Sequence, residues 1–558
     1  MKQWMIIFLI ALLHPISGHC QTKLKRPKLV IGIVVDQMRY DYLTRFYDHY
    51  QDEGGFKYLI NNGINFTDMH YNYAPTTTGP GHATIWSGAS PAFSGIANNH
   101  FYLREEGRKV YCVNDEQVNT IGQNNGSGKK SPHRMLVSNL GDELKLSNNH
   151  QSKVISVSLK DRSAILPAGY MADGAYWYDG GTGNFVSSSF YMDELPKWVK
   201  DYNRLKRSDE LLKQPWELLL PSSAYSVSLS DDNPYEGTFY EEQKPTFPHD
   251  LPTISKKMRK DGRSAYYMLM HTPHGNTLVS EMAKQAIISE QMGKHDFTDL
   301  LAISYSSTDK IGHQFAPASM EIQDTYLRLD RELGGLLKFV DQEVGMQDVL
   351  IFLTADHAGA QNAMYMVDKK FHNAKYVQTG EMVSHLQQKL TAKYGEGKWV
   401  LDMEGEQIYL NRKLINEKGL ELNAVQNYAS QLILTQPSVQ DAVSLNSLQS
   451  SSYENHYKEL LANGAHPTRS GDVFIIFHTG VILGKGKTGT SHSMTYNYDT
   501  HVPLLMMGFG LPKGVEISDK TRITQIAPTI SNKMKISAPS CAFSPVLPIH
   551  QLKETLTP

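Results

Sequence analysis

Short, almost continuous apolar runs, which alternate with segments long enough for helices, constrain the fold of this chain more than any other feature. The runs are rich in Val, Ile and Leu, and they span residues 28–35, 154–159, 300–305, 349–353, 473–477 and 502–507. Runs of this kind are typical of strands buried on both faces, as in a parallel sheet covered by helices. We therefore expect an α/β fold with a mostly parallel sheet and helices on both faces.

Two stretches interrupt this alternation. Residues 174–272 are rich in Tyr, Ser, Pro and mixed charge, and residues 359–469 form a second interruption. At roughly 150 residues per domain the chain would have three or four domains, but large α/β enzymes often carry such a length as one core with insertions. We expect one catalytic domain over residues 21–558, in which both stretches are insertions that cap the active edge of the sheet.

The charge balance and the cysteine content exclude several classes of protein. The chain has 55 Lys and Arg against 57 Asp and Glu, so its formal net charge is −2. Such a chain lacks the broad basic surface with which a protein holds nucleic acid. Only three cysteines occur among 558 residues, and none has a CxxC or zinc-finger spacing. Any metal ligands must therefore be His and carboxylate side chains.

The first 20 residues have the features of an export signal. Lys2 provides a positive charge, residues 4–13 form an apolar run, and a polar tail with a proline leads to Cys20. The apolar run is too short to cross a bilayer core of about 30 Å. We expect a signal peptide over residues 1–20 and a periplasmic or secreted monomer without a stable membrane anchor. Whether Cys20 is removed or lipidated stays open, as does a disulfide between Cys112 and Cys541.

Six side chains that can bind metal ions stand at the ends of predicted strands or just beyond them, where ligands of open α/β sheets bind. They are Asp36, Asp309, His313, Asp356, His357 and His492. Asp309 and His313 would share one face of a helical turn. Any one of the six alone is more often a turn, capping or hydrogen-bonded core residue. Three carboxylates and three imidazoles together predict a site for two zinc ions, since zinc accepts both kinds of ligand.

Three consecutive threonines, Thr76 to Thr78, precede a predicted helix. A hydroxyl at a helix start is usually only a cap. Beside zinc the same hydroxyl becomes a nucleophile, because the ion lowers its pKa and the helix N-terminus presents N–H groups to a phosphate. Asn99 follows Thr78 by 21 residues, and its amide is able to donate to a phosphoryl oxygen.

Several short motifs together resemble a known superfamily. They are P-T-x-T-x-P-G-H-x-x-I from Pro75, an Asp after the first strand, G-I-x-x-N ending at Asn99, D-x-x-x-H from Asp309, T-A-D-H ending at His357, and a late His before Y-N-Y-D-T-H-V-P. Spread over about residues 28–536, these motifs resemble the alkaline phosphatase superfamily. Within it, the chain is most similar to the PafA-type, or phosphate-irrepressible, alkaline phosphatases.

The resemblance implies an alkaline phosphatase with two zinc ions and a Thr nucleophile that forms a covalent phosphothreonine. It implies that Asp309, His313 and His492 hold one ion, and that Asp36, Asp356 and His357 hold the other, which also contacts Thr78. Asn99 would bind a phosphoryl oxygen, and its spacing from Thr78 favours it over the adjacent Asn98. One departure is Ser493-Met494 after His492, where relatives often have small residues, and it concerns the shape of this loop.

Two cations bear on the choice of substrate. Lys160 and Arg162 follow a predicted strand, and in an extended chain residues two apart point the same way. Most such pairs are solvated surface residues, but the resemblance implies that these two contact phosphoryl oxygens. A phosphate monoester has three non-bridging oxygens, whereas a diester has one fewer, so the additional cations favour small-molecule phosphate monoesters as substrates.

Three other functions remain as alternatives. A nucleotide pyrophosphatase/phosphodiesterase of the same superfamily would share Thr78, Asn99 and the metal ligands, but we would expect it to lack the Lys/Arg pair. A sulfatase would need a modified Cys or Ser in a C/S-x-P-x-R motif, which neither Cys112 nor Cys541 provides. An exported protein that captures phosphate without turnover would have no need of a nucleophile.

Overall fold

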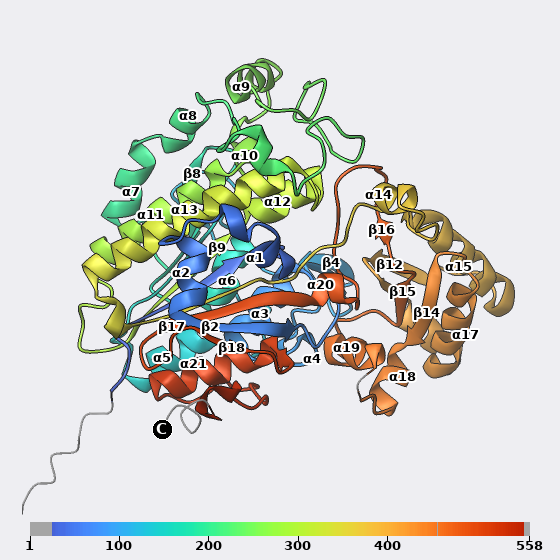
Figure 1. The fold of residues 1–558 in the computed structure, drawn as a ribbon. Helices are drawn as coiled ribbons and strands as arrows, with labels where there is room; N and C mark the ends of the chain where they lie inside the picture. The colour runs from blue at the N-terminus through green and yellow to red at the C-terminus, as the bar shows by residue number, and fades with distance from the viewer. Residues whose placement is uncertain (1–24, 455, 552–558) are drawn as a thin grey trace, which may run out of the picture.

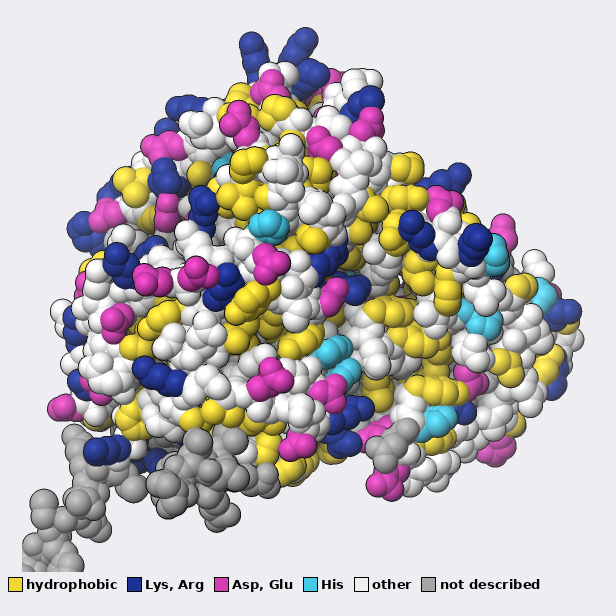
Figure 2. Space-filling view, viewed as in Figure 1, with side chains coloured by type: hydrophobic (Ala, Val, Ile, Leu, Met, Phe, Trp, Pro, Cys, Tyr) yellow, Lys and Arg dark blue, Asp and Glu magenta, His cyan; other side chains and the backbone are white. Residues whose placement is uncertain are grey.

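The structure of the protein, a computed structural model, describes residues 25–454 and 456–551. The predicted signal peptide, with Cys20, lies outside the described residues. Within them, no helix is both long and apolar enough to pass through a bilayer. On the face drawn in Figure 2, basic and acidic side chains are interspersed, as the near-neutral net charge leads one to expect.

An eleven-stranded sheet forms the centre of the larger part of the molecule (Figure 1). Along its main path the strands are β18 (Val515–Ile517), β2 (Gly63–His70), β17 (His501–Gly508), β10 (Val349–Thr354), β1 (Leu29–Val35), β9 (Asp299–Tyr305), β6 (Val154–Ser158), β7 (Gly174–Asp179), β8 (Asn184–Ser188) and β5 (Thr120–Ile121); β19 (Thr521–Arg522) pairs with β2. The five strands β10, β1, β9, β6 and β7 are parallel neighbours. These strands form because their Val-, Ile- and Leu-rich runs are buried along their whole length.

Helices cover both faces of the sheet. One layer contains α2 (Gly55–Asn62), α11 (His274–Ser289) and α13 (Met320–Glu343), and the other contains α3 (Thr78–Ser87), α5 (Leu140–Ser147), α6 (Asp161–Ala168) and α21 (Ile526–Met534). Helix α3 packs closely because Gly32 of β1 has no side chain. A Cβ atom there would lie 2.4 Å from the ring of Trp86. The predicted α/β fold with a mostly parallel sheet is confirmed.

A smaller lobe contains a separate four-stranded antiparallel sheet (orange in Figure 1). Its strands, in order, are β12 (Val400–Glu404), β13 (Gln407–Leu410), β15 (Val473–Phe477) and β14 (Val439–Ser444), and helices α15 (Gly380–Tyr394) and α17 (Leu422–Leu434) pack against it. The run at residues 473–477 therefore belongs to this lobe, so its assignment to the parallel sheet was wrong. Its alternate side chains enter two different hydrophobic clusters, which explains why the run is apolar throughout.

Two further expectations about the main sheet need correction. Strand β17, predicted as a parallel strand, runs antiparallel to both β10 and β2. Strands β7 and β8 fall inside the first predicted insertion, yet they extend the main sheet beyond β6. The aromatic-rich sequence of β7 is buried along its whole length, but its Tyr and Trp residues did not match the aliphatic pattern of the other strands.

Candidate active site

The carboxyl ends of three neighbouring parallel strands deliver five of the six predicted metal ligands to one edge of the sheet. Asp36 directly follows β1, and Asp356 and His357 follow β10. Strand β9 leads into α12 (Ser307–Phe315), which presents Asp309 and His313 one turn apart. The sixth residue, His492, comes from the loop between β16 (Val481–Leu483) and α20 (Asn497–Thr500). The six residues lie in two groups of three.

Asp309, His313 and His492 form the first group, with ligand atoms within 4.8 Å of one another. Asp309 Oδ1 lies 3.0 Å from His313 Nε2 and 3.7 Å from His492 Nε2. Although burial opposes it, the nearby His313 and Lys160 charges hold the pKa of Asp309 well below its usual range. Burial and the two neighbouring imidazoles lower the pKa of His492 well below its usual value, so its ring is neutral.

Asp36, Asp356 and His357 form the second group, and all three are fully buried. His357 Nε2 lies 3.5 Å from Asp36 Oδ1 and 3.7 Å from Asp356 Oδ2. Burial and the charge of Asp356 raise the pKa of Asp36 well above its usual range. Burial also lowers the pKa of His357, which keeps this imidazole neutral. A buried cluster that contains two carboxyl groups needs a positive counter-charge when these groups are ionised.

The hydrogen bonds of the three histidines fit metal ligation. Each ring donates its Nδ1 hydrogen to a backbone carbonyl: His313 to Thr490 at 2.8 Å, His357 to Ala358 at 2.9 Å, and His492 to Thr76 at 2.7 Å. These bonds leave every Nε2 lone pair directed at a carboxylate, which is the tautomer that a metal ligand requires. Asp36 Oδ1 and Asp356 Oδ2 are buried without a hydrogen-bond partner, so both oxygens are available to an ion.

Ring orientation separates the two groups. His313 and His492, in the same group, are tilted by 43°, whereas His492 and His357, in different groups, stack with planes 14° apart. Lone pairs in the planes of stacked rings run side by side and do not converge on one ion.

The same argument applies to a third cluster, Asp68, His70 and His501, which the sequence analysis missed. There the two imidazoles stack at 14°, as in an aromatic stack rather than a metal site.

Thr78 is the first residue of α3 and lies between the two groups and Arg162. Its Oγ1 is 3.5 Å from His357 Nε2 and accepts a hydrogen bond from Arg162 Nη2 at 3.3 Å. No side chain caps α3, so the Thr78 hydroxyl has no structural role at the helix start. It stands at the positive end of the α3 dipole, where free N–H groups favour an anion.

The predicted substrate-binding residues surround Thr78, although two of them do so in an unexpected way. Asn99 accepts a hydrogen bond from Gly79 N at 2.7 Å, which orients its amide towards the start of α3. Arg162 lies in the first turn of α6, so the expectation of an extended chain at Lys160 and Arg162 was wrong. Lys160 precedes α6, and its Nζ lies 2.6 Å from both Asp36 Oδ2 and Asp309 Oδ2. Its ammonium thus bridges the two groups.

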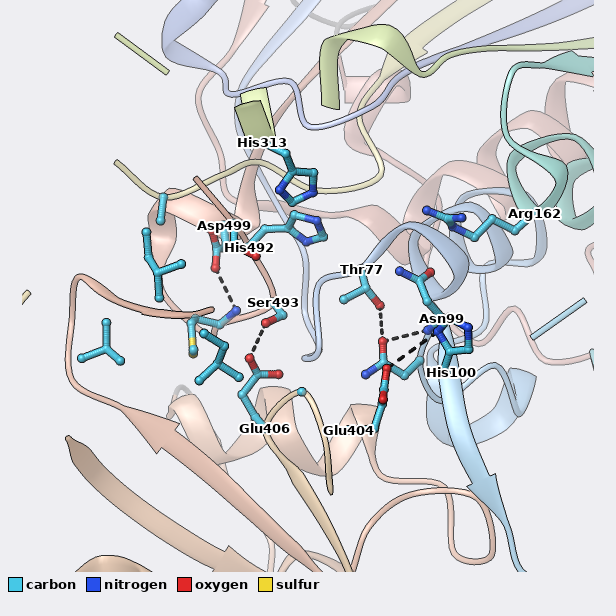
Figure 3. Close-up of a pocket in the computed structure, with 18 of the residues that line it drawn as sticks. Thr77, Asn99, His100, Arg162, His313, Glu404, Glu406, His492, Ser493 and Asp499 are labelled. Carbon is cyan, nitrogen blue, oxygen red and sulfur yellow. Dashed lines mark hydrogen bonds and ion pairs between the residues drawn. The ribbon is translucent and has the colours of Figure 1, made fainter. Parts of the chain in front are cut away.

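Some of the predicted site residues line a cavity of about 320 Å³ between the main sheet and the smaller lobe (Figure 3). Arg162, Asn99, His313 and His492 line one side. The turn between β12 and β13, with Glu404 and Glu406, and the apolar strand β16 line the other. Part of the second predicted insertion, the turn with Glu404 and Glu406, therefore lies against this edge of the sheet.

Two buried residues support the site but had no role in the sequence analysis. His82 contacts the Thr78 carbonyl at 2.9 Å through Nδ1, which also lies 3.3 Å from Asp356 Oδ2. Gln37 donates its side-chain amide to Asp309 Oδ1 at 2.9 Å and its backbone N–H to Asp356 Oδ1 at 3.2 Å. His82 could have been identified from the sequence, because it is the histidine of the P-G-H part of the threonine motif. For Gln37 the only indication in the sequence was its position directly after Asp36.

Cys112 and Cys541 remain separate thiols. The disulfide that the sequence left open is therefore not formed in the structure. Cys112 is buried against Gly79 at the start of α3, and burial raises the pKa of its thiol to about 12. It is an inert packing residue.

Comparisons with known proteins agree with this geometry. The sequence profile of the family described as type I phosphodiesterase / nucleotide pyrophosphatase matches residues 30–502. A protein of Myroides odoratus named calcium-transporting ATPase is 42% identical over 521 residues, which cover 93% of both chains. The alkaline phosphatase PafA of Elizabethkingia meningoseptica is 39% identical over 543 residues, or 97% of both chains.

The crystal structure of wild-type PafA superimposes with a TM-score of 0.88 at 39% identity, covering 94% of this chain and 99% of that one. The chain belongs to the PafA-like alkaline phosphatases. It is therefore an enzyme of the alkaline phosphatase superfamily, as the motifs implied. In this PafA-like alkaline phosphatase, the two His/Asp groups are the candidate metal sites of the superfamily's bimetallic centre.

Proposed function

We propose that this PafA-like alkaline phosphatase hydrolyses phosphate monoesters with two zinc ions and through a covalent phosphothreonine on Thr78. The observation that carries the proposal is the placement of the Thr78 hydroxyl beside His357 Nε2, at the start of a helix and between two His/Asp groups. A site for phosphate capture would have no need of a hydroxyl at this point. The relatives named alkaline phosphatase support the same reaction.

The ligand set supports zinc as the metal. Asp309, His313 and His492 would hold one ion, and Asp36, Asp356 and His357 would hold the other, with Thr78 beside it. Mixed imidazole and carboxylate ligation suits zinc, whereas magnesium and calcium favour oxygen ligands alone. When bound, the two ions supply the positive charge that lowers the pKa of a hydroxyl and stabilises negative oxygens.

Different residues of the chain would have different roles in the reaction. The helix N-terminus, Asn99 and Arg162 orient the phosphoryl group in front of Thr78. The Thr78 hydroxyl would lose its proton to solvent as its oxygen forms a bond to phosphorus. The bond to the leaving oxygen breaks, and the leaving alkoxide takes up a proton from solvent. Water then attacks the phosphothreonine, which releases phosphate and restores the hydroxyl. Most of the rate enhancement would come from positioning and electrostatic stabilisation.

Lys160 and Arg162 support a preference for monoesters. Arg162 lies beside Thr78, where it reaches the oxygens of a group attached to that hydroxyl. Lys160 adds a second buried positive charge at the carboxylates of both metal groups. PafA has also been solved as a variant in which one Thr, one Asn, one Lys and one Arg are replaced. The Thr and Asn replaced there are separated by the same number of residues as Thr78 and Asn99.

We also propose that the enzyme acts in the periplasm or outside the cell, as a monomer. The support is the composition of residues 1–20, with Lys2 and the apolar run 4–13. Mass spectrometry of the mature N-terminus tests it. A first residue close to Cys20 is expected, and retention of Lys2 would contradict the signal peptide.

Elemental analysis and activity measurements test the proposed function. About two zinc ions per chain are expected, together with turnover of p-nitrophenyl phosphate. His357→Ala and His492→Ala should each lose one ion, from different groups, and most of the activity, whereas the control His49→Ala on the surface should lose neither. Stoichiometric magnesium or calcium without zinc would contradict the metal assignment, and faster turnover of a diester than of a monoester would favour the phosphodiesterase alternative.

A further inference from the structure

Ser493, next to the predicted metal ligand His492, has an unusual backbone conformation. Its φ angle is 119°, in the left-handed half of conformational space that favours glycine. A residue with a Cβ atom stays in such a conformation only when its surroundings impose it. The contacts of Ser493 therefore decide how His492 is held.

One of these contacts comes from the smaller lobe. The Ser493 hydroxyl donates a hydrogen bond to Glu406 Oε1, as Figure 3 shows. The backbone on either side has contacts of its own: the Ser493 carbonyl accepts from Thr76 N at 3.4 Å, and Met494 N donates to Asp499 at 2.8 Å. The hydrogen bond to Glu406 is the side-chain contact that the structure gives for Ser493.

Glu406 is itself held rigidly. It is the second residue of the two-residue turn between β12 and β13, and its carbonyl accepts a hydrogen bond from Ile475 N of β15 at 2.8 Å. Its side chain is buried, and Oε2 has no hydrogen-bond partner. Burial raises the pKa of Glu406 to about 7. A buried carboxylate with so few partners is costly unless it has another role.

The chain of contacts continues to the metal group. His492 donates its Nδ1 hydrogen to the Thr76 carbonyl at 2.7 Å, while Thr76 N donates to the Ser493 carbonyl. His492, Ser493 and Thr76 are thus joined by two hydrogen bonds, and the conformation of Ser493 determines where the imidazole of His492 points. In this arrangement His492 Nε2 lies 3.7 Å from Asp309 Oδ1.

We infer that Glu406 is a positioning residue, through which the smaller lobe holds Ser493 in its left-handed conformation and so aims His492 at the first metal group. This inference rests on the proposed zinc site. It assigns to the lobe a role in metal affinity, exerted from a residue that is not itself one of the predicted metal ligands. Partners of metal-ligating histidines typically change metal affinity by about 10- to 100-fold when they are removed.

Zinc affinity, measured by competition with a chelator, tests the inference in four variants. Glu406→Ala should weaken one of the two zinc ions by about 10-fold or more, whereas Glu406→Gln, which keeps an acceptor for Ser493, should stay close to the wild type. Glu406→Ala combined with Ser493→Gly should recover most of the affinity, because glycine adopts a φ of 119° without help. Asp441→Ala on β14 is the matched control, since it removes a hydrogen-bonded carboxylate of the same lobe that does not line the cavity.

The rescue separates positioning from a general loss of stability. Both variants that contain Glu406→Ala lose the same buried hydrogen bond, so their unfolding temperatures, measured on metal-free protein, should fall together, while only the double variant regains zinc affinity. Equal zinc affinity in Glu406→Ala and wild type would overturn the inference, as would a double variant as weak as Glu406→Ala. A wild-type protein that binds no zinc would contradict the proposed function itself, and this inference with it.

Discussion

Of the three consecutive threonines at the start of α3, only one has its hydroxyl in position for chemistry. Thr76 donates to a backbone carbonyl at 3.3 Å, and Thr77 donates to an asparagine side chain at 2.8 Å. Thr78 instead lies against His357 and Arg162. The first two hydroxyls are therefore structural, and only the family resemblance, not the local pattern of residues, had distinguished Thr78 from them.

Thr78→Ala should retain both metal ions and the fold but lose activity by orders of magnitude, because no oxygen remains to form the covalent intermediate. Thr78→Ser should keep part of the activity, since it retains a hydroxyl at the same place. Steady-state kinetics and elemental analysis of the purified variants check both outcomes. If Thr76→Ala or Thr77→Ala abolished turnover while Thr78→Ala remained active, the nucleophile would be a different residue.

Replacing Lys160 and Arg162 together by Ala should lower monoesterase kcat/KM far more than diesterase kcat/KM. Charge-assisted hydrogen bonds contribute about 1.5 to 3 kcal/mol each, so a loss of roughly 10- to 100-fold per residue is expected, without strict additivity. Arg162→Ala alone isolates the contact beside Thr78, because Lys160 also neutralises Asp36 and Asp309. Equal losses on both substrates would mean that the pair stabilises charge common to both reactions.

The residue-scale predictions succeeded where position along a strand determines position in space. Asp36, Asp309 and Asp356 each follow a parallel strand, so their meeting at one edge could be derived from the sequence. Backbone conformation was harder to predict from the sequence. Arg162 begins a helix, although residues two apart in a strand were expected, and nothing in the sequence indicated the φ angle of Ser493.

At the scale of elements, the site depends on how closely α3 approaches β10. Gly81 in the first turn of α3 makes this approach possible, because a Cβ atom there would lie 2.3 Å from the Asp356 carbonyl oxygen. Helix α3 carries Thr78, and the segment after β10 carries two metal ligands. The distance between nucleophile and metal group is thus set by one residue without a side chain.

Gly81→Ala should therefore destabilise the protein by about 1 to 3 kcal/mol through overpacking and should reduce activity by displacing α3. Urea unfolding and kinetics of the purified variant measure the two effects. The same change at Gly380, the first residue of α15, is a matched control, since a Cβ atom there meets nothing within 4 Å. Equal stability of Gly81→Ala and the wild type would show that α3 can shift freely.

The apolar runs predicted which segments are strands but not which sheet each strand joins. β15 and β1 have similar sequences and are both buried throughout, yet they lie in different sheets. A continuous apolar run reports burial on two faces and carries no information about the partners across its edges. The antiparallel orientation of β17 could not be predicted from the sequence for the same reason.

At the scale of the whole molecule, the metal ions should contribute to stability as well as to catalysis. Asp36, Asp309 and Asp356 are buried close together, and the Lys160 ammonium is a positive charge that bridges the two groups. Removing the metal with a chelator should lower Tm, since a ligand at a thousand times its Kd contributes about 4 kcal/mol. Zinc should restore both Tm and activity, and an unchanged Tm would argue against ions in these groups.

The central claim is that the main sheet and the smaller lobe together form a two-zinc phosphomonoesterase. The ratio of kcat/KM for p-nitrophenyl phosphate to that for bis-p-nitrophenyl phosphate, measured on the zinc-loaded wild-type protein, tests it most directly. With Lys160 and Arg162 available to the additional phosphoryl oxygen, a ratio of about 100 or more is expected. A ratio below one would contradict the account and would indicate a phosphodiesterase.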